Sequence, residues 1–168
     1  MTDLQTRVQL RPYQQNDLPF LLQLYTSSRS HELEQAPFSS EQKTAFLAQQ
    51  FAAQFHHYST YYSTERFDII LIDKIAVGRL FVDHWTSEIR VVDISLLPEY
   101  QQQKIGTYLF QLLFIQSQQL QKPITIHVEQ HNPARLWYEK LGFTYKSTTN
   151  EVYLLMERQP SLSPLCAC

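Results

Sequence analysis

The sequence is poor in glycine, the residue that most relaxes backbone geometry. Its 168 residues include only Gly78, Gly106 and Gly142, where ordinary usage of about 7% would give roughly a dozen. Glycine is favoured where a backbone approaches a neighbour closely or takes a positive φ. We therefore expect local requirements at Gly106 and Gly142, although Gly142 can simply end a helix and Gly106 can simply let a helix and a strand pack.

Cysteine is almost absent as well. Cys166 and Cys168 stand at the C-terminal end, too close in sequence to cross-link a core, so stability must come from burial in a reducing compartment. The first residues lack the apolar segment of a signal peptide, and no run approaches the roughly 20 apolar residues of a membrane span. We expect a cytoplasmic protein that does not contact membranes.

Charge of either sign is scarce. Charged residues make up 18% of the chain and the formal net charge is -2, which offers no basic stripe for nucleic acid. With 43% apolar residues, the chain can bury one core but not comfortably two. We expect one domain over residues 1–158 and a C-terminal tail over residues 159–168, in a monomer or homodimer.

What the sequence does contain is a clear succession of patterns. Helical spacing of apolar residues follows capping residues in several places, and β-rich runs joined by turns dominate from Phe67 onward. The predicted helices begin near Asn16, Ser39, Lys104 and Pro133, and the predicted strands cover residues 8–12, 67–72, 75–82, 89–97, 124–128, 143–145 and 152–156. The three strands between residues 67 and 97 are typical of an antiparallel meander.

Two short segments carry most of the functional information. In the first, Leu97–Thr107, a strand stops at Pro98 and becomes a polar turn that opens a helix. Such a turn directs free backbone N–H groups and the positive end of the helix dipole at an anion. In the second, Asn132–Phe143, a short helix with Asn132 and Pro133 at its start carries Tyr138.

Together the two segments resemble the acyl-CoA site of the GNAT superfamily of N-acetyltransferases. The second matches the family pattern Asn-x-Ala-x-x-x-Tyr-x-x-x-Gly-Phe without a gap. The first matches the phosphate turn Arg/Gln-x-x-Gly-x-Gly/Ala at Gln101 and Gly106, with Lys104 in place of the first glycine. The resemblance covers roughly residues 6–158. It implies an α/β (α+β), GNAT-type acyl-CoA N-acyltransferase fold with a mixed, mostly antiparallel sheet of about seven strands flanked by about four helices.

By this resemblance, acetyl-CoA is the co-substrate and no metal takes part. Gln102–Thr107 would line its phosphates, and backbone groups of Ile94–Leu96 would meet its acyl group. The full set of expected acetyl-CoA contacts is Ile94, Ser95, Leu96, Gln101, Gln102, Gln103, Lys104, Ile105, Gly106, Thr107, Asn132, Ala134 and Tyr138. Lys104 costs on the order of 1 kcal/mol if φ must be positive there. If that position is already helical, lysine is harmless and its ammonium can aid phosphate binding.

Tyr138 is the expected general acid, because a phenol can donate a proton or a hydrogen bond to the departing thiolate. The attacking amine must lose a proton, and the sequence offers two candidate bases. Asp93 is a carboxylate within an apolar strand, where burial disfavours the ionised form. His127, whose imidazole type titrates near neutral pH, stands on the neighbouring strand where several family members carry a catalytic glutamate. Glu129 lies on the same face as His127 and could orient or replace it.

The acceptor is harder to predict. The polar stretch between residues 27 and 38 contains Arg29 and Glu32, which we expect to bind a carboxylate or an amine of the acceptor. The predicted function is transfer of an acetyl group from acetyl-CoA directly to a primary amine of a small molecule, peptide or protein. A non-catalytic acyl-CoA-binding module of the same fold, favoured by Lys104, is the main alternative, and an interaction protein that uses the aromatic segment Phe55–Tyr62 is another.

Overall fold

The computed structural model describes residues 2–163, which fold around a 7-stranded sheet. The strands are β1 (Val8–Pro12), β2 (Phe67–Ile72), β3 (Ile75–His84), β4 (Ile89–Leu96), β5 (Ile124–Glu129), β6 (Thr144–Thr149) and β7 (Tyr153–Arg158). They lie in the order β1-β2-β3-β4-β5-β7-β6. The β4–β5 pair is parallel and the other pairs are antiparallel. The expected mixed, mostly antiparallel sheet is therefore confirmed.

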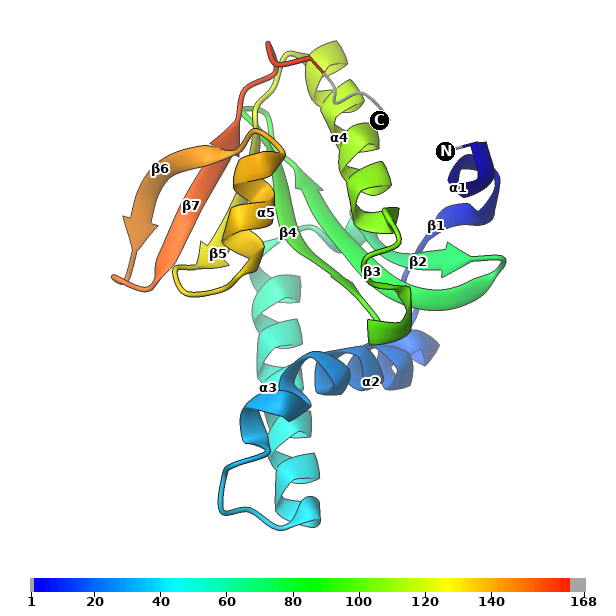
Figure 1. Cartoon of the computed structure of the whole chain (residues 1–168), viewed down its shortest axis with the longest axis vertical. Helices are drawn as coiled ribbons and strands as arrows, with labels where there is room; N and C mark the ends of the chain where they lie inside the picture. The colour runs from blue at the N-terminus through cyan, green and yellow to red at the C-terminus, as the bar shows by residue number, and fades with distance from the viewer. Residues whose placement is uncertain (1, 164–168) are drawn as a thin grey trace.

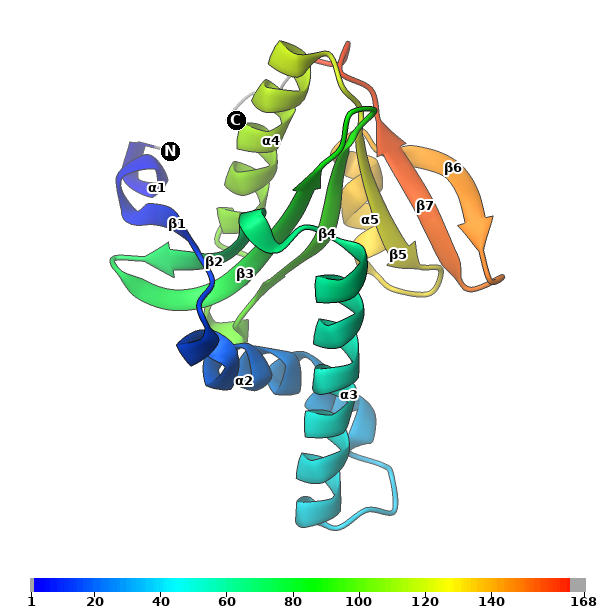
Figure 2. The same ribbon diagram turned by 180° about the vertical axis from the view of Figure 1, so that it is seen from behind.

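Helices cover both faces of this sheet. They are α1 (Thr2–Arg7), α2 (Leu18–Arg29), α3 (Ser40–Tyr61), α4 (Ile105–Leu120) and α5 (Ala134–Lys140). Helices α4 and α5 lie on one face, and α3 lies on the other (Figures 1 and 2). The sequence pattern misses α1, because this short helix has no apolar stripe. It is supported instead by the ion pairs of Arg7 with Asp3 and Asp73.

Each face of the sheet packs its own hydrophobic cluster. On the α4 and α5 side, Phe110 and Phe114 of α4 meet Phe143 after α5, with ring centroids 5.8 and 6.1 Å apart. On the other side, Phe67 and Phe81 stack at 4.2 Å beneath α2 and α3. Because both faces are covered, the central strands β2 and β3 are nearly continuous buried runs.

Helix α3 begins at the capping box that its sequence predicts. The Ser39 hydroxyl accepts a hydrogen bond from the Gln42 N–H at 3.1 Å, and the Gln42 side chain accepts one from the Ser39 N–H at 2.8 Å. Two donors of the first helical turn are thereby satisfied. Of the aromatic segment Phe55–Tyr62 at the other end of α3, Phe55, Tyr58 and Tyr62 pack against the core.

Strands β4 and β5 separate partway along their length. They pair only from Ile89 with Ile124 to Val91 with Ile126, although β4 runs on to Leu96 and β5 to Glu129. At the point of separation β4 is bulged, because Phe81 opposes Asp93 while Val82 opposes Val91, which leaves Val92 without a partner on β3. A bulge bends a strand and increases its twist. The bend turns the end of β4 away from β5.

The described part of the expected C-terminal tail is anchored to the domain. The buried Arg158 donates hydrogen bonds to the carbonyl oxygens of Leu141 and Ser163, both at 2.8 Å. Its guanidinium also lies 3.7 Å from the ring centroid of Phe114. Cys166 and Cys168 lie outside the described residues.

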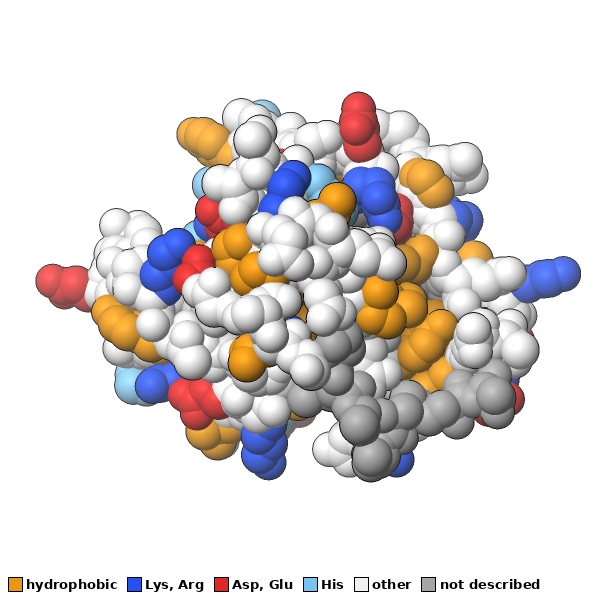
Figure 3. All heavy atoms as spheres, turned by 90° about the horizontal axis from the view of Figure 1, so that it is seen from above, with side chains coloured by type: hydrophobic (Ala, Val, Ile, Leu, Met, Phe, Trp, Pro, Cys, Tyr) orange, Lys and Arg blue, Asp and Glu red, His pale blue; other side chains and the backbone are white. Residues whose placement is uncertain are grey.

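The surface mixes charges of both signs. On the face shown in Figure 3, acidic and basic side chains are interspersed among polar and apolar ones. Among residues 2–163, no helix is long and apolar enough to span a membrane.

Candidate functional site

The polar turn after β4 presents free backbone donors. Helix α4 begins at Ile105, and its first hydrogen bond runs from the Tyr108 N–H to the Lys104 carbonyl at 2.9 Å. Lys104 occupies the N-cap position, and its side chain makes no cap hydrogen bond. The N–H groups of Ile105–Thr107 therefore have no partner within the described chain. They are available to an anion, which the helix dipole also favours.

The turn holds two non-glycine residues in the left-handed region. Gln102 has a φ of 60° and Lys104 a φ of 67°. The sequence analysis left open whether φ is positive or helical at Lys104, and the structure shows that it is positive. A residue with a side chain adopts this conformation less easily than glycine does, at a cost of about 1 kcal/mol per residue. Side chains fix this turn to the preceding segment, because Gln101 Nε2 donates to the Leu96 carbonyl at 3.0 Å and Gln103 Nε2 to the Glu99 carbonyl at 2.7 Å.

A cavity of about 520 Å³, which we call the turn cavity, opens beside this turn where β4 and β5 separate. Every expected acetyl-CoA contact except Gln103 lines it. The side chain of Gln103 is bonded within the turn instead. The cavity is also lined by Ser28 and Trp137, which sequence reasoning did not assign to the site.

Gly106 allows α4 and α5 to approach each other closely. A Cβ atom at this position would lie 2.8 Å from Cη2 of Trp137, a distance too short for van der Waals contact. The interpretation that Gly106 permits packing is thus correct, but its partner is the indole of α5 rather than a strand. Because the chain has only three glycines, Gly106 was the sequence signal for a bulky neighbour at this turn, and that neighbour is Trp137. Gly142, with a φ of 101°, follows the end of α5 as expected.

Tyr138 stands between the turn cavity and a second cavity. Its ring packs on Phe110, Trp137 and Phe143 at centroid distances of 5.9, 5.5 and 6.0 Å. Only 7% of the residue is exposed, and its hydroxyl makes no hydrogen bond to any described residue. Burial, reinforced by the negative charge of Asp93, raises the pKa of Tyr138 above its ordinary value. The phenol therefore stays protonated and is a donor without a partner.

The second cavity, which we call the side cavity, has a volume of about 550 Å³. It shares Tyr138, Ser95 and Asn132, among others, with the turn cavity. The Asn132 side chain also accepts a hydrogen bond from the Ala134 N–H at 2.9 Å, which orients the start of α5. Arg29 and Glu32, the expected acceptor contacts, both line the side cavity. Their charged groups lie 3.9 Å apart.

Asp93 lines the side cavity but is not a lone carboxylate among apolar side chains. Its Oδ2 accepts a hydrogen bond from Arg79 Nε at 2.6 Å and also contacts Arg79 Nη2. Arg79, which is 3% exposed, in turn donates from Nη2 to Gln54 at 2.8 Å. Asp93 therefore lies in an ion pair with Arg79 and not in the purely apolar setting that its strand suggested. Oδ1 of Asp93 has no partner in the described chain and remains an acceptor.

His127 also lines the side cavity, and its ring is held by Arg90. Arg90 Nη1 lies 3.3 Å from His127 Nδ1, and because a guanidinium only donates, Nδ1 is the acceptor and Nε2 carries the proton. Desolvation, with the positive charge of Arg90, lowers the pKa of His127. A neutral ring with a protonated Nε2 is a hydrogen-bond donor, so this geometry disfavours His127 as the base.

Arg90 is itself part of a network that the sequence analysis did not find. Its Nε donates to the Thr125 hydroxyl at 2.8 Å, and its Nη2 lies 3.3 Å from the Glu88 carboxylate. Its guanidinium also stacks 4.6 Å from the Trp85 ring centroid. Glu129, predicted either to orient His127 or to replace it, makes no hydrogen bond to His127 and is a carboxylate without an ion pair in the described chain. It too lines the side cavity.

The described residues contain no group of three or more His, Cys, Asp or Glu side chains able to hold a metal.

Residues 63–145 match the family model of the acetyltransferase (GNAT) domain. No curated protein matches the sequence significantly.

Solved structures extend the similarity to almost the whole chain. The PaiA N-acetyltransferase of Thermoplasma acidophilum, in complex with coenzyme A, superimposes with a TM-score of 0.63 at 17% identity, over 90% of this chain and 98% of that one. The ribosomal-protein-S18-alanine N-acetyltransferase of Escherichia coli has a TM-score of 0.57 at 18% identity, over 93% and 96%. Naa50 of Arabidopsis thaliana, with a CoA–peptide bisubstrate analogue, has a TM-score of 0.55 at 18% identity, over 91% and 99%. At these identities the likeness shows a shared fold.

Proposed function

Because this chain is an N-acetyltransferase of the GNAT family, we propose that it binds acetyl-CoA in the turn cavity and transfers the acetyl group directly to a primary amine held in the side cavity. The observation that carries this proposal is the position of Tyr138, whose unpartnered phenol borders both cavities. Two substrates bound in these cavities would meet at that hydroxyl.

The turn cavity suits a nucleotide pyrophosphate. The free N–H groups of Ile105–Thr107 offer donors to phosphate oxygens, and the cationic residue Lys104 lines the same space. The cavity then continues along the backbone of Ile94–Leu96 to Tyr138, which suits an extended arm that ends in a thioester. We assign these residues, with Asn132 and Ala134, to acetyl-CoA binding.

The side cavity suits an amine. Of its carboxylates, Glu32 lies near Arg29 and Asp93 is paired with Arg79, whereas Glu129 is unpaired. With His127 neutral, the carboxylates that line the side cavity outnumber its arginines. The resulting negative charge favours a cationic acceptor over an anionic one. The acceptor is then a small molecule or a peptide whose amine enters past Glu129 and the rim residues Arg29 and Glu32.

The proposed reaction is a direct transfer. The neutral amine attacks the thioester carbonyl carbon, a C–N bond forms, the C–S bond breaks and CoA departs as a thiolate. Asp93 Oδ1 accepts a hydrogen bond from the amine N–H and orients it. Solvent water that enters the side cavity takes the ammonium proton before attack and the second nitrogen proton after the C–N bond has formed. Tyr138 donates a hydrogen bond to the thiolate. Because its pKa is raised, hydrogen bonding rather than complete proton transfer is its expected contribution.

The proposal is tested by measuring thiol release from acetyl-CoA with a panel of acceptors. The panel contains alkylamines, amino-acid amides and peptides with free N-termini, since the Escherichia coli and Arabidopsis neighbours are described with a protein alanine and a peptide analogue. We expect turnover with at least one cationic amine and weaker turnover when a carboxylate adjoins the amine. Acetyl-CoA binding without turnover across the panel would instead support an acyl-CoA-binding module.

A further inference from the structure

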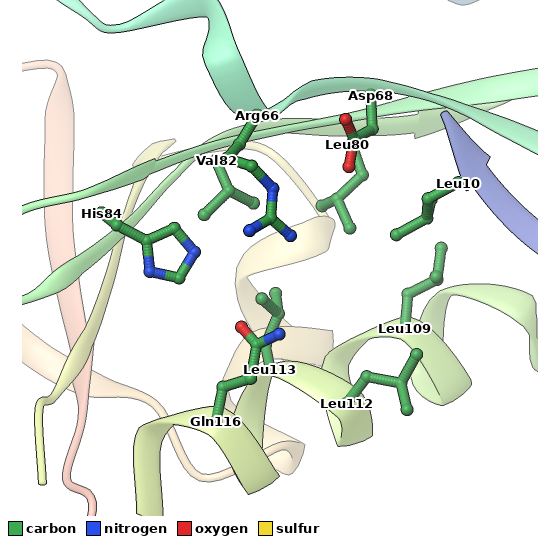
Figure 4. Close-up of a pocket in the computed structure, with 10 residues that line it drawn as sticks. All are labelled: Leu10, Arg66, Asp68, Leu80, Val82, His84, Leu109, Leu112, Leu113 and Gln116. Atoms are coloured by element: carbon green, nitrogen blue, oxygen red, sulfur yellow. The ribbon is translucent and has the colours of Figure 1, made fainter. Parts of the chain in front are cut away.

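A third, smaller cavity of about 60 Å³ lies between α4 and the strands β1–β3. Figure 4 shows His84 and Gln116 on its wall, and His84 Nε2 and Gln116 Oε1 are buried without a hydrogen-bond partner. Within residues 2–163 it shares no lining residue with the turn cavity or the side cavity. An imidazole nitrogen and an amide oxygen single out no ligand. The polar groups around Asp93 in the side cavity are more specific.

Helix α3 contributes one wall of the side cavity. Gln54 and Tyr58 both line it, and their spacing of four residues places them on the same face of the helix. Gln54 accepts a hydrogen bond from Arg79, which also holds Asp93. The ring centroid of Tyr58 lies 5.9 Å from the Cζ atom of the same guanidinium. Tyr58 therefore lies beside the ion pair that fixes Asp93.

The hydroxyl of Tyr58 is accessible and free. Tyr58 is only partly buried, and its hydroxyl makes no hydrogen bond to any described residue. The hydroxyl is also not one of the fully buried, unpartnered polar atoms of residues 2–163. The ring is held by edge contacts with Phe81 and Tyr62, at centroid distances of 6.5 and 6.3 Å. A fixed phenol thus offers its hydroxyl to a ligand of the side cavity.

Asp93 lies near two phenols, Tyr58 and Tyr138. Burial raises the pKa of both tyrosines, and the negative charge of Asp93 raises each pKa further. Both phenols therefore stay protonated, and the oxygen of each can still accept a hydrogen bond. Tyr138 borders both cavities, whereas Tyr58 lines only the side cavity. Tyr58 is therefore placed to contact the acceptor and not acetyl-CoA.

An attacking primary amine has to be oriented. Its nitrogen carries two N–H groups and one lone pair, and the lone pair must face the thioester carbonyl carbon beside Tyr138. Asp93 Oδ1 and the Tyr58 hydroxyl oxygen are two free acceptors, which match the two N–H groups in number. When both N–H groups are bonded, the direction of the lone pair is fixed, which favours attack. A neutral secondary amine has one N–H and leaves one acceptor unpaired.

We propose that Tyr58 makes this site selective for primary amines, because its hydroxyl oxygen accepts one N–H of the acceptor nitrogen while Asp93 Oδ1 accepts the other. The inference rests on the proposed acetyl transfer, since it assigns a contact to the amine held in the side cavity. Tyr58 neither takes nor gives a proton in the reaction. Its contribution is to bind and orient the nitrogen.

The test compares Tyr58→Phe with the wild type, using a primary amine that the wild type accepts and its N-methyl derivative. The variant keeps the ring and its contacts with Phe81 and Arg79, so stability and acetyl-CoA affinity should remain near wild type. We expect kcat/KM for the primary amine to fall about tenfold, the cost of one hydrogen bond. For the N-methyl amine kcat/KM should change less than about twofold, because its single N–H pairs with the charged Asp93.

Tyr61→Phe, which removes a 70% exposed phenol hydroxyl from the same helix, is the matched control and should behave as the wild type does. An unchanged kcat/KM for the primary amine in folded Tyr58→Phe would overturn the proposal. Equal losses for the two amines would overturn it as well, because a merely structural role does not distinguish them. Either result leaves acetyl transfer in place, whereas a wild type that acetylates no amine would refute the proposed function itself.

Discussion

The turn cavity and the side cavity are built in different ways. The turn cavity takes its shape from backbone: the bulge at Val92, the left-handed residues Gln102 and Lys104, and the first N–H groups of α4. The side cavity takes its character from charged side chains on neighbouring strands, Arg79 with Asp93 and Arg90 with His127. Backbone features should therefore govern acetyl-CoA affinity, and the Arg79–Asp93 ion pair should govern turnover.

The largest expected effect follows from breaking a pair in the side cavity. Arg79→Met leaves Asp93 without its cation, and removing one partner of a buried ion pair costs about 3–5 kcal/mol of unfolding free energy. In protein that is still folded at low temperature, we expect kcat/KM to fall roughly 10²-fold, because the Asp93 carboxylate is no longer held. Acetyl-CoA affinity should hardly change.

Arg135→Met is the control for this variant. It removes an exposed pair with Glu139, and such pairs contribute at most about 1 kcal/mol. A folded Arg79→Met protein with normal kcat/KM would show that the pair has no part in turnover.

Gly106→Ala tests whether the close approach of α4 and α5 shapes the turn cavity. Its new Cβ would meet Trp137 at 2.8 Å, so we expect a loss of about 1–3 kcal/mol in unfolding free energy. Acetyl-CoA affinity, measured by calorimetry, should weaken by up to tenfold as α4 and α5 move apart. Trp137→Phe removes the atoms that collide, and the double variant should recover part of the stability. If it recovers none, the close approach is not the reason for the glycine.

Lys104 separates backbone strain from charge. Asparagine adopts the left-handed region more easily than lysine, so Lys104→Asn should raise the unfolding free energy by a few tenths of a kcal/mol. The same variant should weaken acetyl-CoA binding about threefold at low salt, with the difference disappearing at high salt because exposed charges are screened. Lys104→Gln retains the strain and should show only the loss of affinity. A salt-independent affinity would remove the ammonium from the phosphate site.

The smallest effect is expected at His127. Because its pKa is lowered from the ordinary value, the imidazole is mostly neutral at pH 7 and above, so we expect a decline in kcat/KM between pH 8 and 7 to come from another group. His127→Gln, which keeps a donor, should lower kcat/KM less than about threefold and leave that decline in place. A loss of about 10²-fold or more, with the acidic limb flattened, would restore His127 as the general base.

Sequence reasoning succeeded where local signals exist. The Pro98 break, the polar turn and the spacing from Asn132 to Phe143 place almost all of the turn cavity, and alternating and helical patterns place the strands and the main helices. Arg79 and Arg90 were missed because Asp93 and His127, which they contact in the side cavity, lie on neighbouring strands. Both arginines are buried and lie in largely apolar strands, as Asp93 also does. Charges of opposite sign in neighbouring apolar strands were the available signal that these side chains pair.

The most direct test of the account is Tyr138→Phe, measured as acetylated amine formed in a single turnover beside acetyl-CoA affinity. The ring and its packing on Phe110 and Phe143 are kept, so affinity and stability should remain near wild type. Only the thiolate loses its donor, and the rate should fall by about 10²-fold. Tyr145→Phe, an exposed phenol on β6, serves as the control. A wild-type rate in a well-folded Tyr138→Phe protein would contradict transfer at the junction of the two cavities.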